Sequence, residues 1–152
     1  MSVLDPGSSP QVRYERKPVS ERILVVDDDN GVRDVVCRLL RDRYDVAAAS
    51  SGEEALPLLR HQCWNLLILD VGLPGISGLE ILQAARRAHL DFPVLMLTAC
   101  TDLDVVKTAL NGGVHAYVTK PFECGQLEVT VQLLLASGQS GSGDGRPWRV
   151  NP

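Results

Sequence analysis

The chain has 152 residues, of which 45% are hydrophobic and 22% are charged, a composition that suits one globular domain and excludes disorder throughout. The formal net charge of −4 gives no broad basic field, which disfavours direct nucleic-acid binding. No apolar run is long enough for a membrane span, and the first residues lack the apolar segment of a signal peptide, so we expect a cytoplasmic protein without a membrane partner. Four cysteines without a CxxC pair favour neither a zinc site nor a disulfide framework.

The first predicted elements follow a flexible leader. Residues 1–20 contain Pro, Gly and Ser without an apolar period. Ile23–Val26 is a run of apolar, mostly β-branched residues that predicts a buried strand, and three acids, Asp27 to Asp29, follow it directly. Apolar residues then recur at helical spacing over Val32–Leu40, which predicts the first helix.

A second strand and helix come next. Asp45–Ala49 is the predicted strand. Ser51 and Glu54 have the spacing of a capping box, which predicts a helix that runs to about His61. Pro57 lies inside that helix and removes a hydrogen-bond donor, so we expect a kink or fraying there.

The middle of the chain repeats this alternation. The unbroken apolar run Leu66–Leu69 predicts a strand covered on both faces, and it ends at Asp70. After a loop, Leu79–Ala88 has the apolar spacing of a third helix. Phe92–Leu97 is the fourth predicted strand, and it finishes at Thr98.

Two further helices and one strand complete the predicted fold. Asp102 can cap a fourth helix that stops at Asn111–Gly113, and Val114–Thr119 is the fifth strand. Cys124–Ala136 is the fifth helix. Five strands alternating with helices predict a doubly wound, three-layer α/β domain with a parallel sheet. We expect this domain to span residues 21–137 and residues 138–152 to form a Gly/Ser-rich linker or tail.

Polar residues stand where the apolar strands end. Asp27 and Asp28 follow the first strand, Asp70 the third, Thr98 the fourth and Lys120 the fifth. The carboxyl ends of parallel strands share one edge, where open α/β sheets build their sites. Three neighbouring carboxylates repel by several kcal/mol at an effective dielectric near 20, so the cluster needs a cation or a shared proton. Oxygen-only ligands of short reach favour Mg²⁺.

This set of residues suits phosphoryl transfer. The sequence offers no Ser-His or Cys-His pair for acyl transfer, and no glycine-rich nucleotide-binding motif, so we expect no nucleotide cofactor. A carboxylate nucleophile, Asp70, beside a metal, a lysine and a hydroxyl can accept a phosphoryl group. The backbone carbonyl of Gly72 can point at the metal.

The stretches ILVVDDD, SGEEAL, LLILDVGLPGISGLEIL, PVLMLTA and TKPF, spread in order over Arg22–Ala136, resemble the receiver domains of two-component response regulators. The resemblance implies a flavodoxin-like fold with strand order 2-1-3-4-5 and five helices. It implies Asp70 as the phosphoacceptor and as a Mg²⁺ ligand, Asp28 as a direct Mg²⁺ ligand, Asp27 as a ligand largely through water, and the Gly72 carbonyl as a further ligand.

The resemblance also implies a switch. Thr98 and Lys120 would contact the phosphoryl group, and Lys120-Pro121 would be a cis peptide. The added charge on Asp70 would draw both side chains inward, and Tyr117 would turn into the space that Thr98 vacates. The surface of helix four, strand five and helix five would then change and form the output face.

The implied partners are a sensor histidine kinase or phosphotransfer protein on one side and an output domain or downstream protein on the other. Homodimerisation stays open. The chain is either a stand-alone regulator or phosphorelay intermediate, or the receiver part of a longer transcriptional regulator, which we favour because a flexible linker leads into Arg146 and Trp148.

Two other functions fit these residues less well. An aspartate-nucleophile phosphatase needs a second aspartate two residues after the first, where this chain has Gly72, so turnover of an external substrate is not expected. A degenerate receiver that only binds proteins conflicts with the complete set of acids.

Overall fold

The computed structural model describes residues 20–99, 104, 107–108 and 111–139 of the chain. The sheet has five parallel strands in the order β2-β1-β3-β4-β5, namely β1 (Arg22–Val26), β2 (Asp45–Ala49), β3 (Leu66–Leu69), β4 (Val94–Thr98) and β5 (Ala116–Thr119). The helices whose bounds are described are α1 (Asn30–Leu40), α2 (Gly52–His61), α3 (Gly78–Arg87) and α5 (Cys124–Gln139). The predicted doubly wound fold and its strand order are confirmed.

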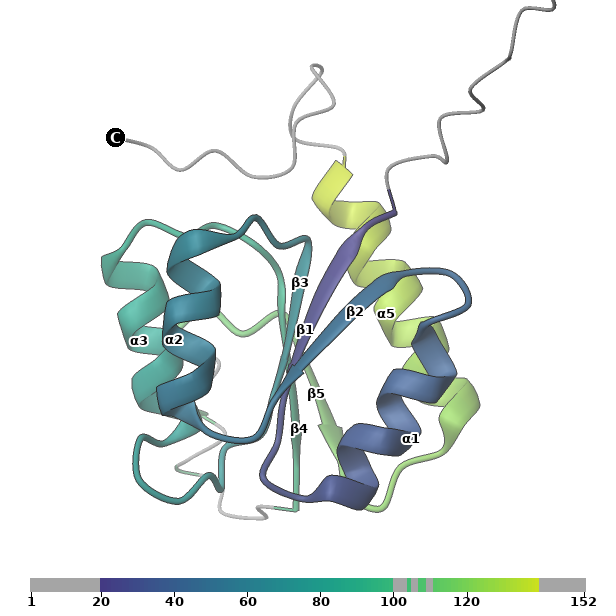
Figure 1. The fold of residues 1–152 in the computed structure, drawn as a ribbon, viewed down its shortest axis with the longest axis horizontal. Helices are drawn as coiled ribbons and strands as arrows, with labels where there is room; N and C mark the ends of the chain where they lie inside the picture. Colours follow the sequence, from purple (N-terminus) through teal and green to yellow (C-terminus); the bar gives the residue numbers. More distant parts are fainter. Residues whose placement is uncertain (1–19, 100–103, 105–106, 109–110, 140–152) are drawn as a thin grey trace, which may run out of the picture.

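Helices cover both faces of the sheet (Figure 1). Helices α2 and α3 lie on one face and α1 and α5 on the other. Neighbouring residues of a strand point to opposite faces, so Leu24 and Val26 join the core under α2 and α3 while Ile23 and Val25 join the core under α1 and α5. The central strands β1, β3 and β4 are therefore buried on both faces, which explains their unbroken apolar runs.

Side-chain caps fix where the helices begin. Asp29 caps α1 by accepting the backbone N–H groups of Gly31 at 2.8 Å and Val32 at 3.2 Å. Ser77 and Glu80 form a reciprocal capping box at the start of α3. The third acid after β1 is thus engaged by its own helix.

The predicted capping box of α2 is half formed. Ser51 accepts the Glu54 backbone N–H at 3.2 Å, but the Glu54 carboxylate accepts the N–H and hydroxyl of Ser50 instead of the Ser51 N–H. Helix α2 continues through Pro57, and Ala55 and Leu59 on either side of it pack in the core. Fraying at Pro57 is therefore not seen, and the alternative of a kink there stays a prediction.

The last two predicted helices differ in how far the structure tests them. Helix α5 ends at Gln139 and not at Ala136, so the helix extends into the Gly/Ser-containing segment, where the Ser137 hydroxyl donates to the Leu134 carbonyl at 2.9 Å. Most of the predicted fourth helix, with Asp102, lies outside the described residues. The residues described there, Asp104, Lys107, Thr108 and Asn111, are helical.

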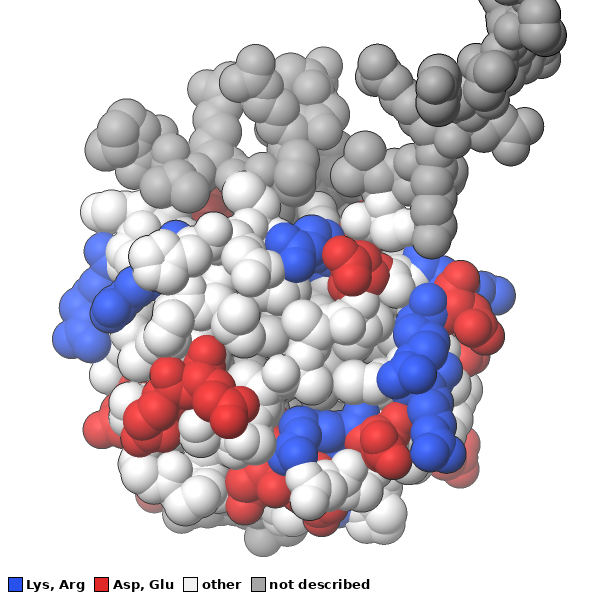
Figure 2. Space-filling view, viewed as in Figure 1, with Lys and Arg blue, Asp and Glu red and all other residues white. Residues whose placement is uncertain are grey.

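The strands of Figure 1 run toward the lower edge of the drawing, so their carboxyl ends meet there, while β1 begins and α5 ends at the opposite edge. On the face seen in Figure 2, Lys and Arg are interleaved with Asp and Glu rather than gathered in one basic field. In the part of the chain that the structure describes, no helix has both the length and the apolar character of a membrane span.

Candidate functional site

Strand register brings two of the predicted site carboxylates together. Val26 of β1 pairs with Leu69 of β3, so the residues that follow them, Asp27 and Asp70, leave the sheet side by side. The Asp70 N–H donates to the Val26 carbonyl at 2.9 Å, and both aspartates are buried, with exposures of 1% for Asp27 and 6% for Asp70. Two acids held this closely out of water need compensation by a cation.

Lys120, which follows the edge strand β5, supplies a cation at the same carboxyl edge of the sheet. Thr98 of β4 pairs with Thr119 of β5, and the Lys120 N–H donates to the Thr98 carbonyl at 2.9 Å. The Lys120 ammonium lies 2.6 Å from Asp27 Oδ2 and 3.2 Å from Asp70 Oδ2. A single ammonium therefore bridges the two buried carboxylates.

The three carboxylates of the cluster differ in their free oxygens. Asp27 Oδ1 accepts the Asp29 N–H at 2.9 Å and Asp70 Oδ1 accepts the Gly72 N–H at 3.0 Å, so both oxygens of each buried acid are engaged. Asp28 is exposed, and among the described residues none hydrogen-bonds or ion-pairs with its carboxylate. Asp28 is the acid that keeps its oxygens for a ligand.

The pKa shifts follow from burial and proximity. Burial raises the pKa of Asp27, and the charge of Asp70 adds to this, while Lys120 and the Asp29 N–H oppose it. Burial by itself lowers the pKa of Lys120, but hydrogen bonds and charges from Asp27 and Asp70 outweigh it, so the net pKa of Lys120 is raised. Lys120 is therefore an ammonium at neutral pH.

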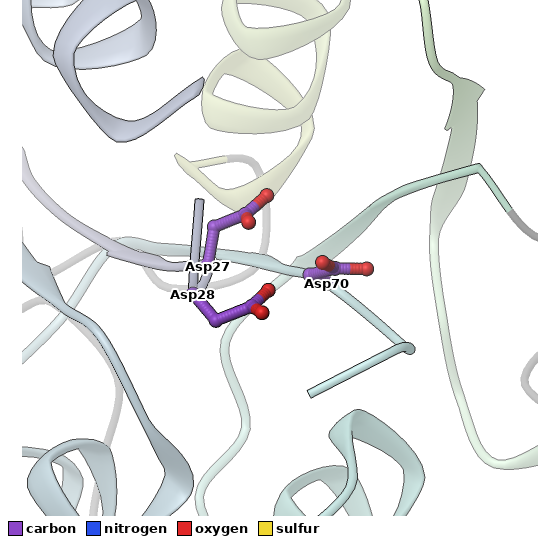
Figure 3. Close-up of side chains that lie close together, drawn as sticks. All are labelled: Asp27, Asp28 and Asp70. Carbon is purple, nitrogen blue, oxygen red and sulfur yellow. The ribbon is translucent and has the colours of Figure 1, made fainter. Parts of the chain in front are cut away.

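The cluster fits a hard divalent cation. Asp27, Asp28 and Asp70 each offer one oxygen, and these oxygens lie within 4.8 Å of one another. Figure 3 shows the three carboxylates directed to the same side, Asp27 and Asp28 from the end of β1 and Asp70 from the end of β3. An all-oxygen donor set with one free carboxylate suits Mg²⁺, which retains several waters.

The whole arrangement corresponds to a known family. The family described as "Response regulator receiver domain" matches residues 23–132 of the sequence. The chain belongs to the response regulator receiver family. Receiver domains are phosphoacceptors that bind Mg²⁺ at an acidic site and interact with histidine kinases, and the acidic cluster at the end of β1 and β3 has that character.

Known proteins agree with the assignment. The receiver is 39% identical over 124 residues to "Transcriptional regulatory protein AfsQ1" of Streptomyces coelicolor, a match that covers 80% of this chain and 54% of AfsQ1. It is 37% identical over 118 residues to "Alkaline phosphatase synthesis transcriptional regulatory protein PhoP" of Bacillus subtilis, covering 77% and 49%. The chain thus spans about half the length of these relatives.

A solved structure shows the same fold. A CheY-like response regulator receiver domain protein from Methanospirillum hungatei superposes with a TM-score of 0.77 at 28% identity, and the match covers 81% of this chain and 99% of that one.

The structure describes the remaining predicted site residues of the receiver as well. Thr98 is 1% exposed at the end of β4, and the Lys120-Pro121 peptide is cis, as predicted. Tyr117 on β5 is half-buried and packs against the core under α2 and α3. Gly72 is exposed, and the role predicted for its carbonyl stays a prediction, as does the movement of Tyr117.

Sequence reasoning missed Gly78. A Cβ at this buried residue would lie 2.1 Å from the Asp70 carbonyl oxygen and 2.8 Å from the Val71 Cα. The first turn of α3 therefore packs directly against the backbone that carries Asp70. A glycine eight residues after an aspartate gives no signal of this contact, because it depends on how the loop returns to the sheet.

Proposed function

We propose that this receiver accepts a phosphoryl group on Asp70 from the phosphohistidine of a sensor histidine kinase or phosphotransfer protein. The observation that carries the proposal is the site itself: one buried carboxylate at a strand end, bridged by the Lys120 ammonium and flanked by two further acids. Protein groups of this kind offset the charge that moves during phosphoryl transfer.

The proposed step is an exchange of one bond for another. A carboxylate oxygen of Asp70 attacks phosphorus and forms an O–P bond as the N–P bond of the phosphohistidine breaks. The electron pair stays on the donor imidazole nitrogen, which takes a proton from solvent. Later attack by water on phosphorus releases inorganic phosphate and restores the Asp70 carboxylate.

Four side chains and one carbonyl have distinct proposed roles. Mg²⁺, when bound, would offset charge on the phosphoryl oxygens. Asp28 would hold it directly because no residue that the structure describes bonds to its oxygens, and the Gly72 carbonyl would be a further ligand. Asp27 would act largely through water because both of its oxygens are engaged. Lys120 and the Thr98 hydroxyl would contact the phosphoryl group.

The proposed output is a change in the surface formed by the fourth helix, strand β5 and helix α5. When Thr98 and Lys120 move toward phosphorylated Asp70, Tyr117 would turn inward and change the surface of the fourth helix, β5 and α5. Because the chain spans about half of relatives named as transcriptional regulators, we propose that the receiver domain, predicted at residues 21–137 and extended by α5 to Gln139, is part of a longer cytoplasmic regulator and that the segment after α5 is its linker.

Intact-mass measurement tests the proposal. The full chain is incubated with acetyl phosphate with and without Mg²⁺, beside Asp70→Asn and the control Asp34→Asn, which changes an exposed acid on α1. A gain of one phosphoryl mass that needs Mg²⁺, persists in Asp34→Asn and vanishes in Asp70→Asn is expected. The absence of any adduct in folded wild-type protein that also fails to bind beryllofluoride would sink the proposal.

A further inference from the structure

We infer that Arg33 is a positioning residue that fixes the backbone turn carrying Asp28, and this inference rests on the proposed Mg²⁺ site. Arg33 lies in the first turn of α1. Its guanidinium Nη1 donates to the Asp27 carbonyl oxygen at 2.6 Å, and its Nη2 donates to the side-chain oxygen of Asn30. The two contacts span the segment that contains Asp28.

Asp28 depends on its neighbours for its position. Its carboxylate is exposed and has no partner among the described residues, so no side-chain contact holds it toward Asp70. Repulsion from Asp27 and Asp70 would drive a free carboxylate outward toward water. Only the backbone on either side can keep Asp28 facing the cluster.

That backbone is anchored at both ends. Before Asp28, the Asp27 carboxylate is held by Lys120 and the Asp27 carbonyl by Arg33. After it, Asp29 donates its N–H to Asp27 and caps α1 with its carboxylate. Arg33 connects the two anchored ends, because its planar guanidinium joins the carbonyl of the residue before Asp28 to the first residue of α1.

The choice of acceptors leaves the metal ligands free. Arg33 binds a main-chain carbonyl and an amide oxygen, so it occupies none of the carboxylate oxygens that a cation would take. A lysine cannot reproduce this, because it presents a point charge in place of a planar fork with two N–H directions. The geometry of the fork, more than its charge, is what the site uses.

Charge and geometry predict opposite results when Arg33 is changed. If Arg33 contributed only positive charge near the acids, its removal would strengthen divalent-cation binding. If it positions Asp28, its removal weakens binding, as loss of residues that orient metal ligands commonly does by about tenfold or more. Arg33→Lys separates the two further, since it keeps the charge and loses the fork.

The test uses Mn²⁺ as the probe, with free Mn²⁺ measured by electron paramagnetic resonance on the full chain. We expect Kd for Mn²⁺ to rise about tenfold in both Arg33→Gln and Arg33→Lys. Arg38→Gln is the matched control, because Arg38 is an exposed arginine of the same helix that pairs only weakly with Asp34 at 3.5 Å. Thermal unfolding checks that each variant is folded.

Phosphorylation kinetics give a second readout. With acetyl phosphate as donor, the Mg²⁺ concentration for half-maximal rate should rise in the Arg33 variants while the rate at saturating Mg²⁺ stays near that of wild type. A general structural defect would lower the maximal rate as well. If Arg33→Gln does not fold, Asn30→Ala removes the other end of the fork, and it should weaken Mn²⁺ binding in the same direction.

The outcomes are distinct. Folded Arg33 variants, or Asn30→Ala in their place, that bind Mn²⁺ as tightly as wild type or more tightly overturn the inference while leaving the proposed function intact. Wild-type protein that does not bind Mn²⁺, or binding that survives Asp28→Asn, overturns the metal site itself and the inference with it.

Discussion

The two edges of the sheet treat charge in opposite ways. At the carboxyl edge, three acids lie close together, one ammonium bridges two of them, and Asp28 has no partner in the described structure. At the amino edge, the Arg22 side chain pairs with Asp45 at 3.1 Å, donates to Gln62 at 2.6 Å and lies over the Trp64 ring at 4.6 Å. At the amino edge the charges of Arg22 and Asp45 are paired with each other, whereas at the carboxyl edge no described residue pairs with Asp28.

Arg86 is a second charged side chain with hydrogen-bond partners at the amino edge. Its guanidinium donates to the carbonyls of Leu90 at 2.8 Å and Gly113 at 2.9 Å, with Phe92 at 3.4 Å, and so ties together the segments that precede β4 and β5. These contacts stabilise the fold. The comparison indicates that the crowded carboxylates at the carboxyl edge repel one another unless a cation is bound, whereas the contacts at the amino edge stabilise the fold.

The largest expected effect on stability comes from a substitution that disturbs the backbone of Asp70 at the carboxyl edge. Gly78→Ala should lower the free energy of unfolding by about 3 kcal/mol and prevent phosphorylation, because its Cβ would meet the Asp70 backbone. Gly125→Ala in α5 is the control, since nothing lies within 4 Å of its Cβ. Urea unfolding and intact mass measure both. A stable, phosphorylatable Gly78→Ala protein would contradict the described contact.

The second largest expected effect on stability comes from removing the Arg86 side chain at the amino edge. Arg86→Ala leaves carbonyls without their charged donor and should cost about 2 kcal/mol of unfolding free energy, measured by urea denaturation. Phosphorylation of Asp70 by acetyl phosphate should persist in the folded fraction. Arg87→Ala, an exposed neighbour, should change stability by less than about 0.5 kcal/mol. Equal losses in the two variants would refute the special role of Arg86.

A third change should give opposite signs for stability and function. Asp28→Asn removes one of the crowded charges, so without divalent metal it should raise the free energy of unfolding by up to about 1 kcal/mol. The same change should weaken Mg²⁺-dependent phosphorylation. Chemical denaturation in the presence of a chelator measures the first effect, and a loss of stability there would mean that Asp28 is not repelled in the folded protein.

The smallest effect concerns pH at the amino edge. His115 Nδ1 accepts the Val94 N–H at 3.2 Å, and burial, together with the charge of Arg86, lowers the pKa of His115 against the opposing charge of Asp91. The unfolded chain then binds a proton at higher pH than the folded protein does. The stabilisation is full above the ordinary histidine pKa of about 6.5 and is lost as pH falls from there toward the lower folded-state pKa.

Comparing urea midpoints at neutral and mildly acidic pH checks this prediction. The change attributable to His115 should stay below about 0.5 kcal/mol, because the ring remains in contact with solvent. His115→Gln should remove that part of the pH dependence. The His89→Gln variant serves as the control, and an identical pH dependence in wild type and His115→Gln would show that the Val94 contact does not matter.

Much of the site could be predicted from the sequence because strand ends are local features. Apolar runs that stop at Asp27, Asp70, Thr98 and Lys120 report the burial of each segment, and parallel strands bring such ends to one edge. The fold class and the residues that gather there follow from that pattern. The end of α5 did not, because helix propagation to Gln139 continues through residues of low helix propensity.

What the acids do individually was decided by tertiary structure. Composition and spacing by themselves do not distinguish the three aspartates after β1, but the structure engages Asp27 with Lys120 and Asp29 with the start of α1, and gives Asp28 no partner among the described residues. These assignments depend on contacts between residues up to 93 positions apart, such as Lys120 with Asp27. Local periodicity reports which side of an element is buried, whereas hydrogen-bond partners depend on strand register and loop return, which only the packed chain fixes.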